Sequence, residues 1–378
     1  MHIVFQSNEI SGDPTKVTIW GESAGGASVG FHLTAYGGRD DHLFRGAMME
    51  SGNPVFYVPM FTNEYYQQFF IALVNLTNCN ESLDKLQCLR EVPFEEFNAI
   101  VNGTTKINGV PFTTAWNPTI DGDFIQRYTS LQLSEGQFVH VPILDGANSD
   151  EGTAFSPIGI NDTEDFLNSI LTSAPEFGVP TSLANEFLTA YPNDPTVEVV
   201  ASMGDTEDGP PFGEQYRRSA SYWGDYFMIA NRRLTCKTWA TSNLPTYCYR
   251  FNAIPAGIPF EIGVTHFQEV SFVFYNILGV GYLPAAEPPF TGKGENYIRL
   301  SQFMDSNWVS FVHDLNPNSW RYVPGNWNGK EAFWPNYDSI NPEIIVFDAN
   351  VSSYTEPDTF RSEGIQLFID NSPGIYHR

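Results

Sequence analysis

Residues 21–25 read Gly-Glu-Ser-Ala-Gly and follow an apolar run at 17–20. This Gly-x-Ser-x-Gly form is typical of a nucleophile elbow, in which a strand turns sharply into a helix with the serine at the tip. Apolar residues on a helical period after the motif predict that helix. A serine in so strained a turn leaves no room for Cβ atoms two positions away, which explains Gly21 and Gly25. The pattern therefore predicts nucleophilic chemistry at the hydroxyl of Ser23.

The sequence around this motif resembles the type-B carboxylesterase/lipase family, which includes cholinesterases and fungal lipases. The matching segments are 12–26 (Gly-Asp-Pro-Thr-Lys-Val-Thr-Ile-Trp-Gly-Glu-Ser-Ala-Gly-Gly), 43–52 (Leu-Phe-Arg-Gly-Ala-Met-Met-Glu-Ser-Gly), 118–124, 148–153, 263–266, 308–311 and 316–318. The resemblance covers nearly the whole chain, is nearest to fungal extracellular lipases and carboxylesterases, and is weakest at residues 1–10. It implies an α/β-hydrolase fold and cleavage of carboxylic esters.

A serine hydroxyl needs a base to accept its proton and a carboxylate to fix the tautomer of that base. In α/β-hydrolases the three groups follow the chain order Ser, acid, His, and Ser23, Glu151 and His266 appear in that order. Glu151 follows a strand-like apolar run, where parallel sheets place functional groups. Asp150 is the rival candidate for the acid. The alternative without a catalytic role is that Glu151 is a solvated loop carboxylate. The resemblance assigns the acid to Glu151, the residue before a glycine.

Six other histidines compete with His266 for the role of base. Two lie at the termini, where order is doubtful, one lies inside the helix after the serine, one lies near a helix C-terminus, and two flank strands on the side away from the serine. These are, in that order, His2 and His377, His32, His313, and His42 and His140. His266 lies on a loop before an apolar run at 267–277, and it matches the position of the family's base.

Four residues are assigned lesser roles. The backbone N–H of Ala24, which follows the nucleophile, is expected to donate to an oxyanion. Glu22 matches the acidic neighbour of the family's serine and could influence the imidazolium, or it could cap the helix. Phe155 matches an aromatic residue of the acyl pocket in the lipase branch, with a plain core phenylalanine as the alternative. Ser51 is a candidate hydroxyl that supports a catalytic group without itself reacting.

Strand-like and helical runs alternate along the chain, which predicts a mostly parallel sheet with crossover helices. The expected strands are 17–20, 46–50, 142–145, 246–251 and 343–347. The expected helices are 24–35, 63–74, 94–101, 163–172, 182–191, 213–240, 296–313 and 360–369. Gly/Pro-rich stretches at 204–213 and 279–294 read as surface loops. The simplest division is one α/β-hydrolase domain over 1–378.

The chain has 44 acidic and 19 basic residues, a formal net charge of −25, which disfavours nucleic acid and anionic membrane surfaces as partners. No apolar run is long enough for a transmembrane helix. No Cys-x-x-Cys or His-x-x-x-His cluster indicates a metal, and the expected chemistry needs no cofactor. The implied partner is a small-molecule or lipid ester, and no particular oligomeric state follows.

Four cysteines allow three pairings. The resemblance supports Cys79–Cys88, which matches a disulfide position in the fungal members, and leaves Cys236–Cys248 as the second pair. Four reduced thiols are the alternative.

Five Asn-x-Ser/Thr sequons favour the secretory route, although a chain this rich in Asn, Ser and Thr produces several by chance. Their asparagines are Asn75, Asn80, Asn102, Asn161 and Asn350. Residues 1–10 lack the apolar core of a signal peptide. A secreted location is therefore expected from the sequons and cysteines.

In the resembled family the elbow lies well inside the protein, after strands that form the other half of the sheet. Those strands carry a His-Gly-Gly loop whose N–H groups complete the oxyanion hole, and no such loop occurs in this sequence. We therefore expect an N-terminally truncated chain with the first strands missing.

The sequence predicts a serine hydrolase that cleaves carboxylic esters through an acyl-enzyme. Two alternatives stay open: a truncated, catalytically impaired fragment, and a non-catalytic binding module with a cholinesterase-like fold.

Overall fold

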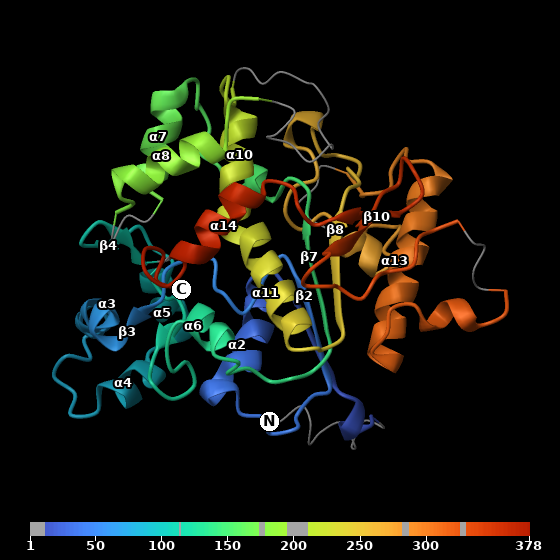
Figure 1. Ribbon diagram of the computed structural model, residues 1–378. Coiled ribbons are helices and arrows are strands. Elements are labelled where there is room, and N and C mark those ends of the chain that lie inside the picture. The colour runs from blue at the N-terminus through green and yellow to red at the C-terminus, as the bar shows by residue number, and fades with distance from the viewer. Residues whose placement is uncertain (1–11, 113–114, 174–177, 195–210, 282–286, 326–329) are drawn as a thin grey trace.

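The computed structural model describes residues 12–112, 115–173, 178–194, 211–281, 287–325 and 330–378 (Figure 1). The central sheet contains β1 (Thr18–Glu22), β2 (Gly46–Glu50), β7 (Ile143–Asn148), β8 (Thr246–Phe251), β9 (Glu343–Phe347) and β10 (Tyr354–Pro357). The helices are α2 (Ala24–Gly38), α3 (Asn63–Leu76), α4 (Lys85–Glu91), α5 (Phe94–Val101), α6 (Thr129–Ser134), α7 (Thr163–Leu171), α8 (Thr181–Ala190), α10 (Tyr216–Gly224), α11 (Ala230–Thr241), α12 (Val270–Val273), α13 (Glu295–Asp314) and α14 (Ser362–Asn371). Two small pairs complete the strands: β3 (Phe61–Thr62) with β6 (Thr119–Ile120), and β4 (Lys106–Ile107) with β5 (Val110–Pro111).

The six strands lie in the order β1-β2-β7-β8-β9-β10, and every neighbouring pair up to β9 is parallel. The predicted parallel sheet with crossover helices is thus confirmed. All residues of β2, β7 and β8 are buried, as expected for strands covered by helices on both faces. The carboxyl ends of β1, β2, β7 and β8 therefore meet at one edge of the sheet.

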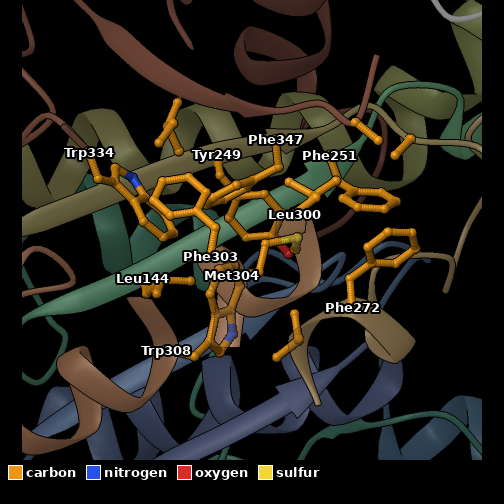
Figure 2. Packing of buried hydrophobic residues seen from close by; sticks show 14 of the residues in the cluster. Leu144, Tyr249, Phe251, Phe272, Leu300, Phe303, Met304, Trp308, Trp334 and Phe347 are labelled. Atoms are coloured by element: carbon orange, nitrogen blue, oxygen red, sulfur yellow. The ribbon is translucent and has the colours of Figure 1, made fainter. Parts of the chain in front are cut away.

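Alternate side chains of the strands pack against two different helical layers. On one face Leu33 of α2, Met49 of β2 and Trp239 of α11 share a cluster with α6. On the other face the sheet packs against α12 and α13, and α13 lies at the right of Figure 1. Figure 2 shows this second layer, in which Tyr249 and Phe347 lie beside Met304 of α13.

Three differences from the expected elements have identifiable reasons. β7 runs three residues beyond the predicted 142–145, because β8 pairs with it as far as Asn148. The predicted helix 213–240 begins at Tyr216 and contains a π-helical turn, Asp225–Ile229, between α10 and α11. The edge strand β10, antiparallel to β9, was not expected, because its short Tyr-Thr-Glu-Pro sequence has no apolar run.

The two predicted disulfides, Cys79–Cys88 and Cys236–Cys248, are both present. The first closes the turn between α3 and α4 in a lobe, residues 61–112 and 115–116, whose small core centres on Phe69 and Phe112. The second joins α11 to β8 and so fastens a helix to the sheet that it covers.

The glycines of the elbow differ in what they do. A Cβ on Gly21 would lie 2.2 Å from the backbone carbon and oxygen of Gly25, so residue 21 must be glycine. A Cβ on Gly25 would meet nothing within 4 Å, so the predicted steric reason for Gly25 is wrong. The second tight contact is at Gly52, whose Cβ would lie 2.2 Å from the carbonyl oxygen of Ser23.

We expect Gly21→Ala to lower the free energy of unfolding by about 3 kcal/mol, because the backbone of the elbow cannot relax without moving β1 from α2. Gly25→Ala is the matched control and should change it by less than about 1 kcal/mol, since alanine favours the helix at an open position. Urea unfolding followed by circular dichroism measures both. Equal effects of the two substitutions would contradict this account.

Candidate active site

Ser23 occupies the turn between β1 and α2 in a left-handed, strained conformation, with φ 54° and ψ −120°. Its N–H donates to the carbonyl of Glu50 on β2 at 2.8 Å, and its own carbonyl accepts from Ala27 at 2.9 Å. These bonds fix the turn against the next strand. The strain is of the kind that surrounding structure must hold in place, and such residues cluster at functional sites.

Ser23, His266 and Glu151 form one hydrogen-bonded row. The Oγ of Ser23 lies 2.8 Å from Nε2 of His266, and Nδ1 of that ring lies 2.6 Å from Oε2 of Glu151. The three groups follow β1, β8 and β7 respectively, so the parallel sheet brings their loops together. In the neutral ring, Nδ1 donates to the carboxylate and Nε2 is left as an acceptor for the serine proton.

Glu151 is fully buried at the start of a 3₁₀ turn, Glu151–Ala154, directly beyond β7. Its Oε1 accepts from the backbone N–H of Asn148 at 2.7 Å and from the hydroxyl of Ser51. Both carboxylate oxygens are therefore occupied, and the alternative of a solvated loop acid is wrong. Ser51 thus supports the carboxylate of Glu151.

Asp150, the rival acid, serves a different contact. Its Oδ2 accepts from the N–H of Val264 at 2.8 Å, and its own N–H donates to the carbonyl of that residue at 2.9 Å. Burial raises the pKa of Asp150 to about 7, against the hydrogen bond from Val264. Asp150 thus braces the loop that leads to His266.

The other described histidines have different neighbours. Their contacts are His32 with Phe124, His42 with Asp40, His140 with Phe138, His313 with Asp314, and His377 with the Tyr128 hydroxyl at 2.7 Å. The expectation of poor order at His377 is wrong, because the next residue, Arg378, is fully buried and donates to the carbonyl of Tyr226 at 2.9 Å. His2 lies outside the described residues.

Three more glutamates surround His266. Glu22 is largely buried, with Oε1 3.4 Å from Nε2 of His266. Glu269 is fully buried and accepts from the Asn148 side-chain amide at 2.6 Å. Glu50, at the end of β2, accepts from the indole N–H groups of Trp20 at 3.0 Å and Trp308 at 2.5 Å.

Glu50 and Glu269 were not expected at the site. The sequence feature that could have identified them is a charged residue within an apolar segment. Glu50 ends the strand-like run 46–50, and Glu269 lies inside the apolar run 267–277.

The cluster of carboxyl groups dominates the electrostatics. Burial alone would lower the pKa of His266, but the charge and hydrogen bond of Glu151, with the charges of Glu22 and Glu269, raise it to about 9. Burial, with the charge of Glu269, raises the pKa of Glu22 to about 8. Burial and the charge of Glu151 raise that of Glu269 to about 7, and burial also raises that of Glu50. The imidazolium form is therefore strongly favoured.

Aromatic side chains form a wall beside the imidazole. The ring of Phe155 lies 5.0 Å from that of His266 and 4.8 Å from that of Phe227, which belongs to the π-helical turn. Tyr57 continues the wall, 6.3 Å from Phe227. Phe155 thus lies both in the core and beside the imidazole, where an apolar group could contact it.

Ala24 is the first residue of α2, directly after the nucleophile. The first N–H groups of a helix have no intrahelical acceptor and carry the positive end of its dipole. The Ala24 N–H is thereby suited to donate to an oxygen that gains negative charge near Ser23.

Comparison with known proteins agrees with this geometry. A model of the carboxylesterase family matches residues 7–361. The chain belongs to the carboxylesterase family. Similar family members include secreted lipase 1 of Botryotinia fuckeliana, 28% identical over 97% of this chain and 59% of that protein. A secreted triacylglycerol lipase of Gibberella zeae is 27% identical over 96% of this chain and 58% of its own length. The chain thus spans rather less than two thirds of these relatives.

The crystal structure of Aspergillus niger EstA has the same fold as this carboxylesterase-family chain. The two superpose with a TM-score of 0.76 at 23% identity, over all of this chain and 68% of EstA. Among the residues that the structure describes, no helix has the length and apolar character needed to cross a membrane.

We expect Glu22→Gln to lower the pKa of His266 by about one unit, because a nearby negative charge stabilises the imidazolium and the neutral amide does not. The titration of the His266 ring, followed by NMR and assigned with His266→Gln, measures the shift directly. The control is Glu295→Gln, which removes an exposed carboxylate from α13. An unchanged His266 titration in Glu22→Gln would show that Glu22 exerts no electrostatic effect there.

Proposed function

We propose that this chain hydrolyses carboxylic esters through a covalent acyl-enzyme on Ser23. The observation that carries the proposal is the row from Ser23 Oγ through the imidazole of His266 to Glu151, with contacts of 2.8 and 2.6 Å. A hydroxyl, a base and a buried carboxylate in this order are the parts that nucleophilic acyl transfer requires. Membership of the carboxylesterase family supports the same reaction.

In the first half of the reaction, Oγ of Ser23 attacks the ester carbonyl carbon while Nε2 of His266 accepts the hydroxyl proton. Glu151 holds the ring in the required tautomer and stabilises its charged form. The carbonyl oxygen becomes an oxyanion, to which the Ala24 N–H donates. The imidazolium then gives its proton to the departing alkoxide, the ester C–O bond breaks, and the acyl group remains on Ser23.

In the second half, a water molecule attacks the acyl carbon as His266 again accepts a proton. The imidazolium returns that proton to Oγ, and the carboxylic acid leaves. The same three side chains thus serve both halves, and these steps need no redox change.

The carboxyl cluster sets the pH at which this base works. With a pKa of about 9, about one imidazole in a hundred is neutral at pH 7 in the free protein. The neutral form is a correspondingly stronger base, and hydrolysis should rise toward alkaline pH. Protonation of Glu22, whose pKa is about 8, removes one of the charges that hold the proton on His266.

The substrate that fits this site carries an apolar acyl group. Phe155 lies directly beside the imidazole and Phe227 lies beside Phe155, so aromatic surface extends away from the catalytic row. We further propose that the chain forms one domain and follows the secretory route. Two disulfides and relatives named as secreted lipases support that location.

The test of the nucleophile is p-nitrophenyl butyrate hydrolysis beside a fluorophosphonate probe. We expect turnover and labelling by the chain, and loss of both in Ser23→Ala, because the attacking oxygen is removed. A folded chain that neither turns over the ester nor takes the probe would instead support a non-catalytic binding module. Labelling without measurable turnover would support the catalytically impaired fragment.

The choice of acid is tested by two isosteric substitutions. Glu151→Gln should keep the fold but lower kcat by about 10⁴-fold, since an amide cannot stabilise the imidazolium. Asp150→Asn retains an oxygen for the Val264 N–H and should lower kcat less than about tenfold. Circular dichroism checks folding in both, and the reverse ranking would mean that Asp150 is the acid.

A further inference from the structure

The sequon at 350–352 lies in the turn that joins β9 to the edge strand β10. Asn350, Val351 and Ser352 are all exposed, and Val351 shows 57% of its surface to solvent. Asp348 stabilises the turn, because its Oδ1 accepts a hydrogen bond from the N–H of Asn350 at 2.7 Å. This Asx-type turn fixes the backbone at Asn350.

The two side chains of this sequon that glycosylation requires are free of hydrogen bonds to the described residues. Among the described residues, no hydrogen bond engages the side-chain amide of Asn350 or the hydroxyl of Ser352. The amides of three other sequon asparagines are engaged: Asn80 donates to Glu81, Asn102 to Asn98, and Asn161 to the Gly159 carbonyl.

The fifth sequon lies within regular structure. Asn75 is in the last turn of α3, and the buried hydroxyl of Thr77 donates to the Leu73 carbonyl at 2.8 Å. In each of the other four sequons a hydrogen bond engages the asparagine amide or the hydroxyl, and in the Asn350 sequon the described residues engage neither.

A pocket of about 230 Å³ lies directly against this sequon. Its lining includes Asn350 and Ser352 of the sequon, Arg299 of α13, and Glu331. Phe303 of α13, labelled in Figure 2, also contributes to its wall. Charged and hydroxyl groups around an aromatic ring suit a single sugar ring, which carries polar edges and an apolar face.

We propose that Asn350 is N-glycosylated and that the first N-acetylglucosamine lies in this pocket, named the Asn350 pocket below. The Asn350 amide nitrogen forms a bond to C1 of the sugar, whose bond to a lipid-linked diphosphate breaks. The amide proton leaves, and the diphosphate is the leaving group, with the host's glycosyltransferase as catalyst. The inference rests on the proposed secretory route and is independent of ester hydrolysis.

The modification is tested by expressing the chain in yeast behind a heterologous secretion leader. Cell lysate and medium are both analysed, because the glycan is added in the endoplasmic reticulum before export. Peptide-N-glycosidase should convert Asn350 to aspartate in mass spectra, and Asn350→Gln and Ser352→Ala should each remove one glycan. Asn161→Gln is the matched control for loss of a different sequon. Unmodified Asn350 in protein that carries glycans elsewhere, or nowhere, would overturn the proposal.

The place of the sugar is tested by trimming all glycans to single N-acetylglucosamine residues with endoglycosidase H. The trimmed chain should unfold about 2 °C above trimmed Asn350→Gln. Arg299→Ala should keep the glycan but remove this difference, because Arg299 is exposed and lines the pocket without joining the core. Equal Tm values for the trimmed chain and Asn350→Gln would show that the sugar does not occupy the Asn350 pocket. Ester hydrolysis measured on the same samples keeps the two proposals separate.

Discussion

A buried carboxylate must be satisfied by donors, and this requirement at Glu151 ties the site together. Its three partners come from different strand ends: Ser51 beyond β2, the Asn148 N–H at the end of β7, and His266 beyond β8. Loss of any one donor would leave charge in an apolar interior, which is costly. The order of the parallel strands and the position of the base are thus linked through one side chain.

The same site contains more carboxyl groups than the single positive charge of His266 could neutralise. Glu22, Glu50 and Glu269 all have raised pKa values, with burial as the largest cause. Protons held by these carboxyl groups reduce their mutual repulsion, and indole donors stabilise Glu50 without adding a positive charge. The imidazole is therefore surrounded by carboxyl groups that exchange protons, and its charge is coupled to theirs.

The sequence predicted what local pattern encodes. Apolar runs that alternate with helical ones identified the parallel strands. The chain order of Ser23, Glu151 and His266, with the family resemblance, identified three groups that the fold brings into contact. Features decided by packing were missed. Strand β10 exists because β9 offers it an edge. Glu269 joins the site because it directly precedes α12 and contacts Asn148 at the end of β7. The open space beside Gly25 likewise depends on neighbours that no motif specifies.

At the π-helical turn between α10 and α11, the direction of the side chains depends on the number of residues in the turn and not on which residues they are. One extra residue per turn rotates everything after it by about 100° relative to an α-helix. Phe227 lies within this turn and contacts Phe155, and α11 after the turn packs on the sheet. Substitution libraries explore only side chains on this fixed path. Changing the backbone path that carries Phe227 would need a single-residue deletion in the π-helical turn. Directed evolution by point mutation never samples such a deletion.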